Sequence, residues 1–225
     1  MSKRNFAVVA VVAVAMLVAG GLYASNMGFK LNYPLASNTT SRSGTNSLAL
    51  PYNQQTNLIN ASDLAADINA TAAPGTVLQI GRFNKQIDLL QVYDTVTLAS
   101  DYALVPGEGY RVQVNQPVDY IVVGSHDPGL VIGLDTTGTN GSKSGTNDFA
   151  FPYHGTAAFA SDLAAEINAQ SGVGAAVLQI GRFNNQIDLL QVYDTVTIAS
   201  DFALSPGESY RIQVNTNVAY VPNHY

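Results

Sequence analysis

A long internal repeat constrains the fold of this chain more than any other feature of its sequence. Residues 77–115 recur at residues 177–215 with substitutions at only six of the 39 positions. Repetition at a fixed period indicates that one structural unit has been duplicated in tandem. The changed pairs are Lys85/Asn185, Leu98/Ile198, Tyr102/Phe202, Val105/Ser205, Gly109/Ser209 and Val112/Ile212. We therefore expect two domains of similar structure, at residues 25–128 and 129–225.

The repeat extends toward the beginning of each unit. The Ser-Gly-Thr-Asn sequence at 43–46 recurs at 144–147, and residues 61–69 recur at 160–168 with one change. The spacing between equivalent positions differs slightly from block to block, so length changes fall between the blocks, where loops tolerate them. The junction at residues 124–128 is short. The two domains are therefore expected to pack closely or to keep a fixed relation.

Composition limits the classes of protein to which the chain can belong. It has 225 residues, of which 47% are hydrophobic and 12% charged. Two domains of about 100 residues fit this length, and each can bury its own core. The net charge is −6, with no basic cluster beyond the first four residues, which argues against a nucleic-acid partner. Cysteine is absent, which excludes disulfides and thiolate metal sites.

Residues 1–24 have the pattern of a secretory signal peptide. Lys3 and Arg4 precede an apolar run over residues 6–18, and small residues crowd the end of that run. Cleavage is expected after Ala24, or after Gly21. The alternative is an uncleaved membrane anchor, because the apolar stretch approaches the ~20 residues that a bilayer requires. In both cases the chain is exported, so the protein is expected to be secreted or at the cell surface, with membrane contact only through an uncleaved leader.

Short strands dominate the rest of each unit. Apolar and polar side chains alternate over residues 110–114, which is typical of a half-buried strand. Pro51, in the alternating stretch 48–52, indicates an edge strand or a strand end. Several short strands separated by turn residues predict a mainly β fold, with a small sandwich or barrel in each unit.

Each unit also contains one short segment with helical character, which in the first unit is residues 62–69. Ser62 is expected to cap its beginning, and Asp63 suits the positive end of the helix dipole. Leu64 and Ile68 are four residues apart and form one apolar stripe. We therefore expect this helix to cover an open sheet face or barrel end.

Three turn-and-strand motifs occur in both units. Gly-Thr-Asn, followed after two residues by Ala-(Leu/Phe)-Pro-Tyr, opens each unit, and Ala-Ser-Asp-Leu begins the helical segment. Pro-Gly-Glu-(Gly/Ser)-Tyr-Arg lies near the end of each unit and is its closing motif. With these motifs the chain resembles a loosely defined group of secreted bacterial tandem β-domains. The resemblance covers both units and implies export and a surface structure, without catalytic residues. Ser209 departs from the closing motif, which has glycine at that position.

A polar cluster near residues 84–86 is the candidate ligand-binding site. If these three residues form a hairpin loop, Arg82 and Asp88 face each other across two strands, and with Asn84 and Gln86 they could bind a polar ligand such as a glycan. The simpler interpretation, which we favour, is a cross-strand salt bridge worth ~0.2–1 kcal/mol. The second unit repeats the cluster as Arg182, Asn184, Gln186 and Asp188.

No residue pattern predicts a metal, a cofactor or a catalytic site. The three histidines lack ligand spacing, and the polar loop at residues 135–141 lacks the acidic residues of a calcium loop. No nucleophile occurs with an acid or base set that would activate it. The chain is therefore expected to be neither an enzyme nor a cofactor-binding protein.

These observations predict a non-catalytic structural or interaction protein whose partner is another protein or a second copy of itself. Residues 25–35 form an extended segment that can pair within its own sheet or reach a neighbouring molecule by donor-strand pairing. Phe29, Leu31 and Tyr33 would then carry the self-association. Lys30 and Pro34 favour pairing within the chain. A glycan-binding module and a filament subunit are the alternatives, although the absence of Trp argues against sugar stacking.

Overall fold

The computed structural model describes residues 28–39, 43–54, 57–125, 127–136, 144–197 and 200–224. The predicted leader lies outside these residues, as do positions 137–141 of the polar loop considered for calcium. The elements of the first unit are β1 (Phe29–Leu35), β2 (Thr45–Ala49), β3 (Asn53–Gln54), α2 (Ala61–Thr71), β4 (Val77–Asn84), β5 (Leu89–Asp94), β6 (Gly109–Val114) and β7 (Val118–Ser125). Those of the second are β8 (Ile132–Leu134), β9 (Thr146–Ala150), α3 (Ala160–Gln170), β10 (Val177–Asn184), β11 (Leu189–Asp194), β12 (Ser209–Val214) and β13 (Val218–Tyr220).

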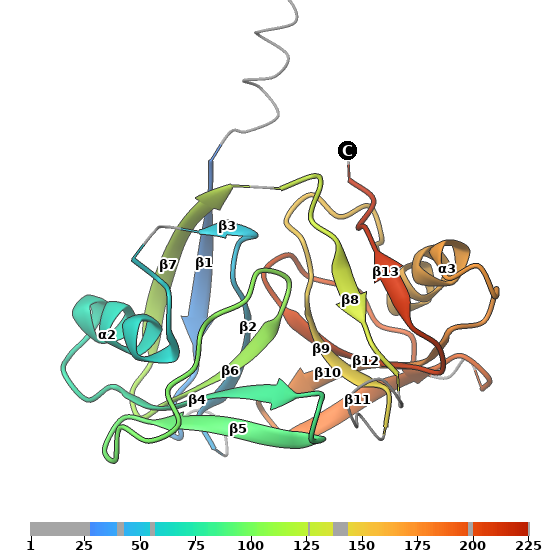
Figure 1. The fold of residues 1–225 in the computed structure, drawn as a ribbon. Helices are drawn as coiled ribbons and strands as arrows, with labels where there is room; N and C mark the ends of the chain where they lie inside the picture. Colours follow the sequence, from blue (N-terminus) through green and yellow to red (C-terminus); the bar gives the residue numbers. More distant parts are fainter. Residues whose placement is uncertain are drawn as a thin grey trace, which may run out of the picture.

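Each unit combines a four-stranded antiparallel sheet with a smaller sheet (Figure 1). The larger sheets have the orders β2-β6-β4-β5 and β9-β12-β10-β11, so equivalent strands occupy equivalent places. The smaller sheets are β1-β7-β3 in the first unit and β8-β13 in the second. The fold is therefore mainly β and consists of two similar sandwich domains, as the repeat predicts.

The strand registers of the larger sheets also agree between the domains. Ile80 pairs with Tyr93 and Val112, and Ile180 occupies the same place in the second sheet. Both central strands carry an irregularity after their first residue, at Val77 and Val177. Nearly identical sequences therefore give identical pairing. The smaller sheets differ, because β7 extends to Ser125 and pairs with β3, whereas β13 is shorter.

The core of each domain lies between its two sheets. In β6 the side chains of Tyr110, Val112 and Val114 are fully buried, while Arg111 and Gln113 on the other face are half-buried. This confirms the alternation expected from the sequence. β2 stands at the edge of its sheet and ends two residues before Pro51, which confirms the edge position that this proline predicts.

The helix of the first domain begins earlier than the sequence indicates. Asn60, and not Ser62, is the N-terminal cap of α2, and its backbone N–H donates to the Asp63 carboxylate at 2.8 Å. Ser62 lies within the first turn and donates its hydroxyl to Asp101 at 2.7 Å. Ser62 is therefore tied to the loop that follows β5 instead of capping the helix.

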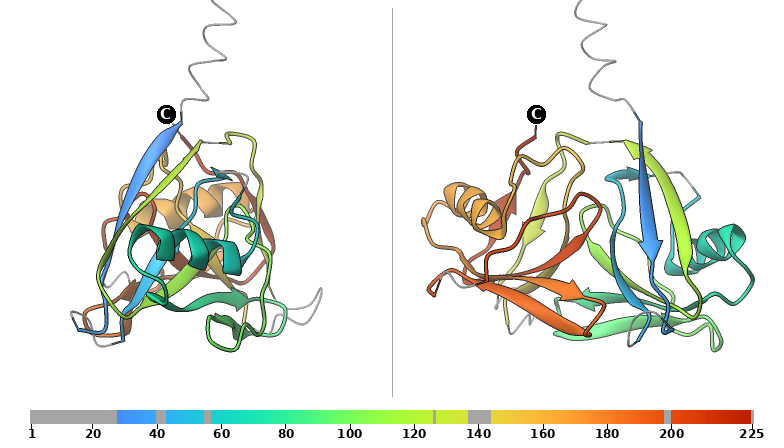
Figure 2. Two further views of the ribbon diagram at one scale, coloured as in Figure 1. Left: turned by 90° about the vertical axis from the view of Figure 1, so that its left-hand side faces the viewer. Right: turned by 180° about the vertical axis from the view of Figure 1, so that it is seen from behind.

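The two helices close the outer sides of the molecule. α2 contacts β4 and β7, one strand from each sheet of its domain, and α3 contacts β10 and β13 in the same way. Leu64 and Ile68 are fully buried in this contact. The helices lie on opposite flanks, as the view from behind also shows (Figure 2). The expected role of the helix as a cover is confirmed.

The first strand pairs within its own domain. β1 runs antiparallel to β7, with Tyr33 opposite Tyr120. Leu31 and Tyr33 point into the core, and the ring of Phe29 stacks on Tyr153 of the second domain with centroids 4.5 Å apart. The three residues expected to carry self-association thus pack within a single chain, in the intramolecular arrangement that Lys30 and Pro34 favour.

Candidate functional site

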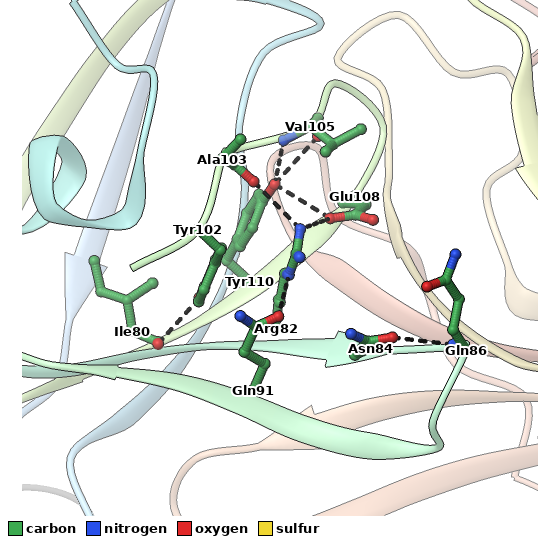
Figure 3. Close-up of polar contacts among 10 residues, drawn as sticks. All are labelled: Ile80, Arg82, Asn84, Gln86, Gln91, Tyr102, Ala103, Val105, Glu108 and Tyr110. Atoms are coloured by element: carbon green, nitrogen blue, oxygen red, sulfur yellow. Dashed lines mark hydrogen bonds and ion pairs between the residues drawn. The ribbon is translucent and has the colours of Figure 1, made fainter. Parts of the chain in front are cut away.

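Arg82 is the centre of the polar cluster in the first domain, and its guanidinium group is held on several sides (Figure 3). Its Nε donates to Gln91 Oε1 at 3.0 Å and its Nη1 to the carbonyl of Ala103 at 3.3 Å. Nη1 also lies 3.7 Å from the Glu108 carboxylate, and the group lies 4.5 Å above the ring of Tyr102. Arg82 therefore joins β4, β5 and the loop that precedes β6.

Arg182 repeats this arrangement in the second domain with longer distances. It donates to the carbonyl of Ala203 at 3.4 Å, and its Nε lies 3.9 Å from Glu208. Its guanidinium group lies 5.4 Å from the ring centre of Phe202, which replaces Tyr102. Three of the four contacts of Arg82 thus recur at Arg182, and the hydrogen bond to Gln91 has no counterpart among the described residues.

The expected pair between Arg82 and Asp88 does not form, because the hairpin turn is longer than the sequence suggests. Asn84 pairs with Leu89, so residues 85–88 form a four-residue turn, and Arg82 stands opposite Gln91. The second domain has the same register, so Arg182 and Asp188 do not face each other either. The predicted three-residue loop at 84–86 is wrong.

Asn84, the last residue of β4, and Gln86, in this turn, lie apart from the arginine cluster (Figure 3). Asn84 Oδ1 accepts the backbone N–H of Gln86 at 3.1 Å, and Asn184 accepts that of Gln186 at 3.0 Å. The asparagines therefore stabilise the turns. The structure does not bring the four candidates of either domain together into one site.

Asp88 and Asp188 bind the opposite domain. Ser144 donates its hydroxyl to Asp88 at 2.9 Å, and Ser43 donates to Asp188 at 2.7 Å. Both contacts join the hairpin of one domain to the loop that leads into the first strand of the other domain's larger sheet. The two aspartates thus position the domains relative to each other.

Backbone hydrogen bonds between the domains follow the same reciprocal pattern. The backbone N–H of Ala49 donates to Gly207 at 2.8 Å, and that of Ala150 donates to Gly107 at 2.9 Å. These interactions occur in pairs with the domains exchanged, as in a two-fold symmetric dimer. Lys85 departs from the pattern, because it donates to the carbonyl of Gly133 at 2.8 Å, whereas its counterpart Asn185 donates to Asn46. The two domains therefore form one body with an approximate two-fold axis.

Two arginines on the outer faces of the larger sheets belong to the same contact. Arg111 lies 5.1 Å from the ring centre of Phe183, and Arg211 lies 4.7 Å from that of Phe83. Arg211 also forms an ion pair with Asp148. Sequence patterns alone do not reveal these residues, because alternation places Arg111 on a solvent-facing side of its strand and says nothing about a second domain covering it.

The ionisable groups near Arg82 are perturbed mainly by burial. Burial raises the pKa of the Glu108 carboxyl, although the positive charges of Arg82 and Lys85 oppose this shift. Burial likewise raises the pKa of the Tyr110 hydroxyl, and the neighbouring Glu108 adds to the effect. The Tyr110 oxygen accepts the backbone N–H of Val105 at 2.5 Å. This tyrosine stays protonated at neutral pH and anchors the turn before β6.

In the described parts of the chain, no group of three or more His, Asp or Glu side chains could hold a metal ion. Among the same residues, no helix has the length and apolar character needed to cross a membrane. The polar side chains described above form contacts within the domains and between them.

Exposed apolar residues gather at the outer edge of each larger sheet. Leu89 and Leu189, at the start of β5 and β11, are 61% and 62% exposed. β5 and β11 are edge strands of the larger sheets, and no described strand pairs with their outer sides. We call the two sets of residues the apolar edges: Ile87, Leu89 and Leu90 in the first domain, and Ile187, Leu189 and Leu190 in the second.

Comparison with models of known families, with curated proteins and with solved structures gives no match to this chain. The class of protein is therefore defined by the fold: a cysteine-free, mainly β protein of two similar sandwich domains joined by a two-fold contact.

Proposed function

We propose that this chain is an exported, non-catalytic interaction protein that assembles with further copies of itself at or beyond the cell surface. The observation that carries the proposal is the pair of apolar edges on β5 and β11. Export rests on the pattern of residues 1–24.

The apolar edges lack the devices that normally prevent edge pairing. Lysine, proline or a short strand usually protects an exposed edge. From Ile87 to Val92 the only charged residue is Asp88, whose carboxylate accepts a hydrogen bond from Ser144. An unprotected apolar edge with free backbone groups is a template for another strand.

A second copy of the chain fits these edges because identical antiparallel strands can pair about a two-fold axis. Each chain carries two equivalent edges, one in each domain. Two self-complementary edges on one rigid body link molecules in series, so open assemblies are expected instead of closed dimers. This differs from donor-strand pairing, since β1 remains in its own sheet.

Charge substitutions at the two edges test this proposal. The chain without its first 24 residues is expected to associate in a concentration-dependent way in sedimentation velocity. Leu89→Lys should limit association to dimers through the remaining edge, and Leu89→Lys with Leu189→Lys should give monomers, because a buried unpaired charge at the contact is costly.

Val173→Lys is the matched control, because Val173 is 63% exposed but lies in the turn after α3. It should leave the assembly unchanged. A wild-type chain that stays monomeric at high concentration contradicts the proposal, and so does a folded double variant that still assembles.

A further inference from the structure

The contact between the domains is asymmetric at Arg211 and its counterpart Arg111. Arg211 binds Asp148 on the neighbouring strand through two hydrogen bonds, Nε to Oδ1 at 2.8 Å and Nη2 to Oδ2 at 3.2 Å. The Asp148 side chain is only 6% exposed. In the first domain Ser47 stands opposite Arg111 in the same register. Its hydroxyl donates to the carbonyl of Ser209 at 2.8 Å, so no carboxylate occupies the equivalent position.

Arg111 is therefore an uncompensated cation. Apart from stacking on Phe183, its guanidinium group makes no hydrogen bond or ion pair among the residues that the structure describes. Burial lowers its pKa, Arg211 lowers it further, and Asp148 opposes both. Asp148, whose charge acts on Arg111, is hydrogen-bonded to Arg211. Asp188, which also lines the groove beside Arg111, accepts a hydrogen bond from Ser43 at 2.7 Å. Neither of these two described carboxylates forms an ion pair with Arg111.

A groove lies beside Arg111 on the outer face of the larger sheet. It has a volume of 270 Å³, near the lower end of the ~300–1,000 Å³ typical of small-molecule sites. Leu90 and Val92 provide apolar walls from the first domain, and Phe183 provides one from the second. Gly81 pairs with Arg111 and lines the groove without filling it.

The groove is also lined by the side-chain amide of Gln79, whose counterpart in the second domain is hydrogen-bonded. The side chain of Gln79 is exposed, and among the described residues its amide has no hydrogen-bond partner. Its counterpart Gln179 donates to Gln213 at 2.8 Å. In the second domain the groups equivalent to Arg111 and Gln79 are therefore bound internally, Arg211 by Asp148 and Gln179 by Gln213.

We propose that the groove binds a small organic carboxylate, which pairs with Arg111 from the side of β4, whereas Asp148 pairs with Arg211 from the neighbouring edge strand β9. A guanidinium group and a carboxylate form strong paired hydrogen bonds, and the half-buried position strengthens them. The apolar walls suit a compact ring, and Gln79 is placed two residues along β4 from Gly81 to bond a polar substituent. The ligand class is therefore a ring-bearing acid, either an aromatic acid or a sugar acid.

Calorimetric titration of the complete two-domain chain tests this assignment with benzoate and glucuronate as probes. Benzyl alcohol and glucose are the matched neutral compounds. Saturable binding of at least one acid, at one site per chain, is expected, and its neutral analogue should bind at least ~10-fold more weakly. No saturation with either acid at millimolar concentration, or equal affinity for the neutral analogue, overturns the proposal.

Two substitutions locate the site. Arg111→Gln removes the cation, and Ser47→Asp supplies an internal carboxylate in the position of Asp148, so each should weaken binding at least ~10-fold. Lys30→Gln removes an exposed charge from β1 and should leave affinity within about twofold of the wild type. Unfolding curves establish that each variant is folded. Unchanged affinity in either folded site variant contradicts the proposal.

Discussion

Leu64→Ala is expected to lower the free energy of unfolding by about 2–5 kcal/mol, as for other fully buried leucines. Leu64 is fully buried on the inner face of α2, and α2 contacts a strand of each sheet of its domain. Alanine leaves a cavity at the centre of this contact, and the two sheets on either side cannot both move to fill it. Leu163 occupies the same place in α3, so Leu163→Ala should be similarly costly.

Urea unfolding of both variants and of the wild type measures this effect. Ile59→Ala serves as the control, because Ile59 is 60% exposed just before the same helix, and it should change stability by no more than ~0.5 kcal/mol. A Leu64→Ala midpoint that coincides with the wild-type midpoint shows that α2 does not cover the core.

Gly145→Ala is expected to destabilise the second domain by about 2–5 kcal/mol, because backbone strain of ~1–2 kcal/mol adds to overpacking of ~1–3 kcal/mol. Gly145 has a φ of +68°, which disfavours any side chain, and an added Cβ would lie 2.0 Å from the carbonyl oxygen of Val214. The backbone N–H of Val214, at the end of β12, donates to the carbonyl of Gly145, just before β9, at 2.9 Å. Gly145 therefore cannot move away from β12 without losing this hydrogen bond.

Gly172→Ala separates strain from the steric clash. Gly172 has a similar φ of +74°, but nothing lies within 4 Å of its added Cβ. Its substitution should cost only ~1–2 kcal/mol. Equal losses of stability for the two variants in the same urea series contradict the close approach of Gly145 to Val214.

Local patterns predicted the parts of the fold that depend on local chemistry. The near identity of the two repeat blocks required a common strand order, and the alternation around Val112 placed its side chain in the core. The spacing of Leu64 and Ile68 indicated the covering helix. In the last two cases the signal and the structure that it specifies lie within a few residues of each other.

The candidate site was less predictable because it depends on backbone conformation and distant contacts. Asp88 adopts a φ of +53°, which is uncommon for a residue other than glycine, and this conformation allows the four-residue turn that separates it from Arg82. Ser43 and Asp188 bind each other across 145 positions. No local pattern specifies such a contact, so the two-fold relation of the domains could not be derived from the repeat alone.

Hydrogen exchange of the chain without its leader, measured at low and at high protein concentration, tests self-assembly through the apolar edges most directly. Backbone amides in β5 and β11 should become more protected as concentration rises, because assembly pairs their free sides. Those in β1 should not change, since β1 keeps its pairing with β7. Protection that is independent of concentration in β5 and β11, or that rises in β1 instead, contradicts the proposed assembly.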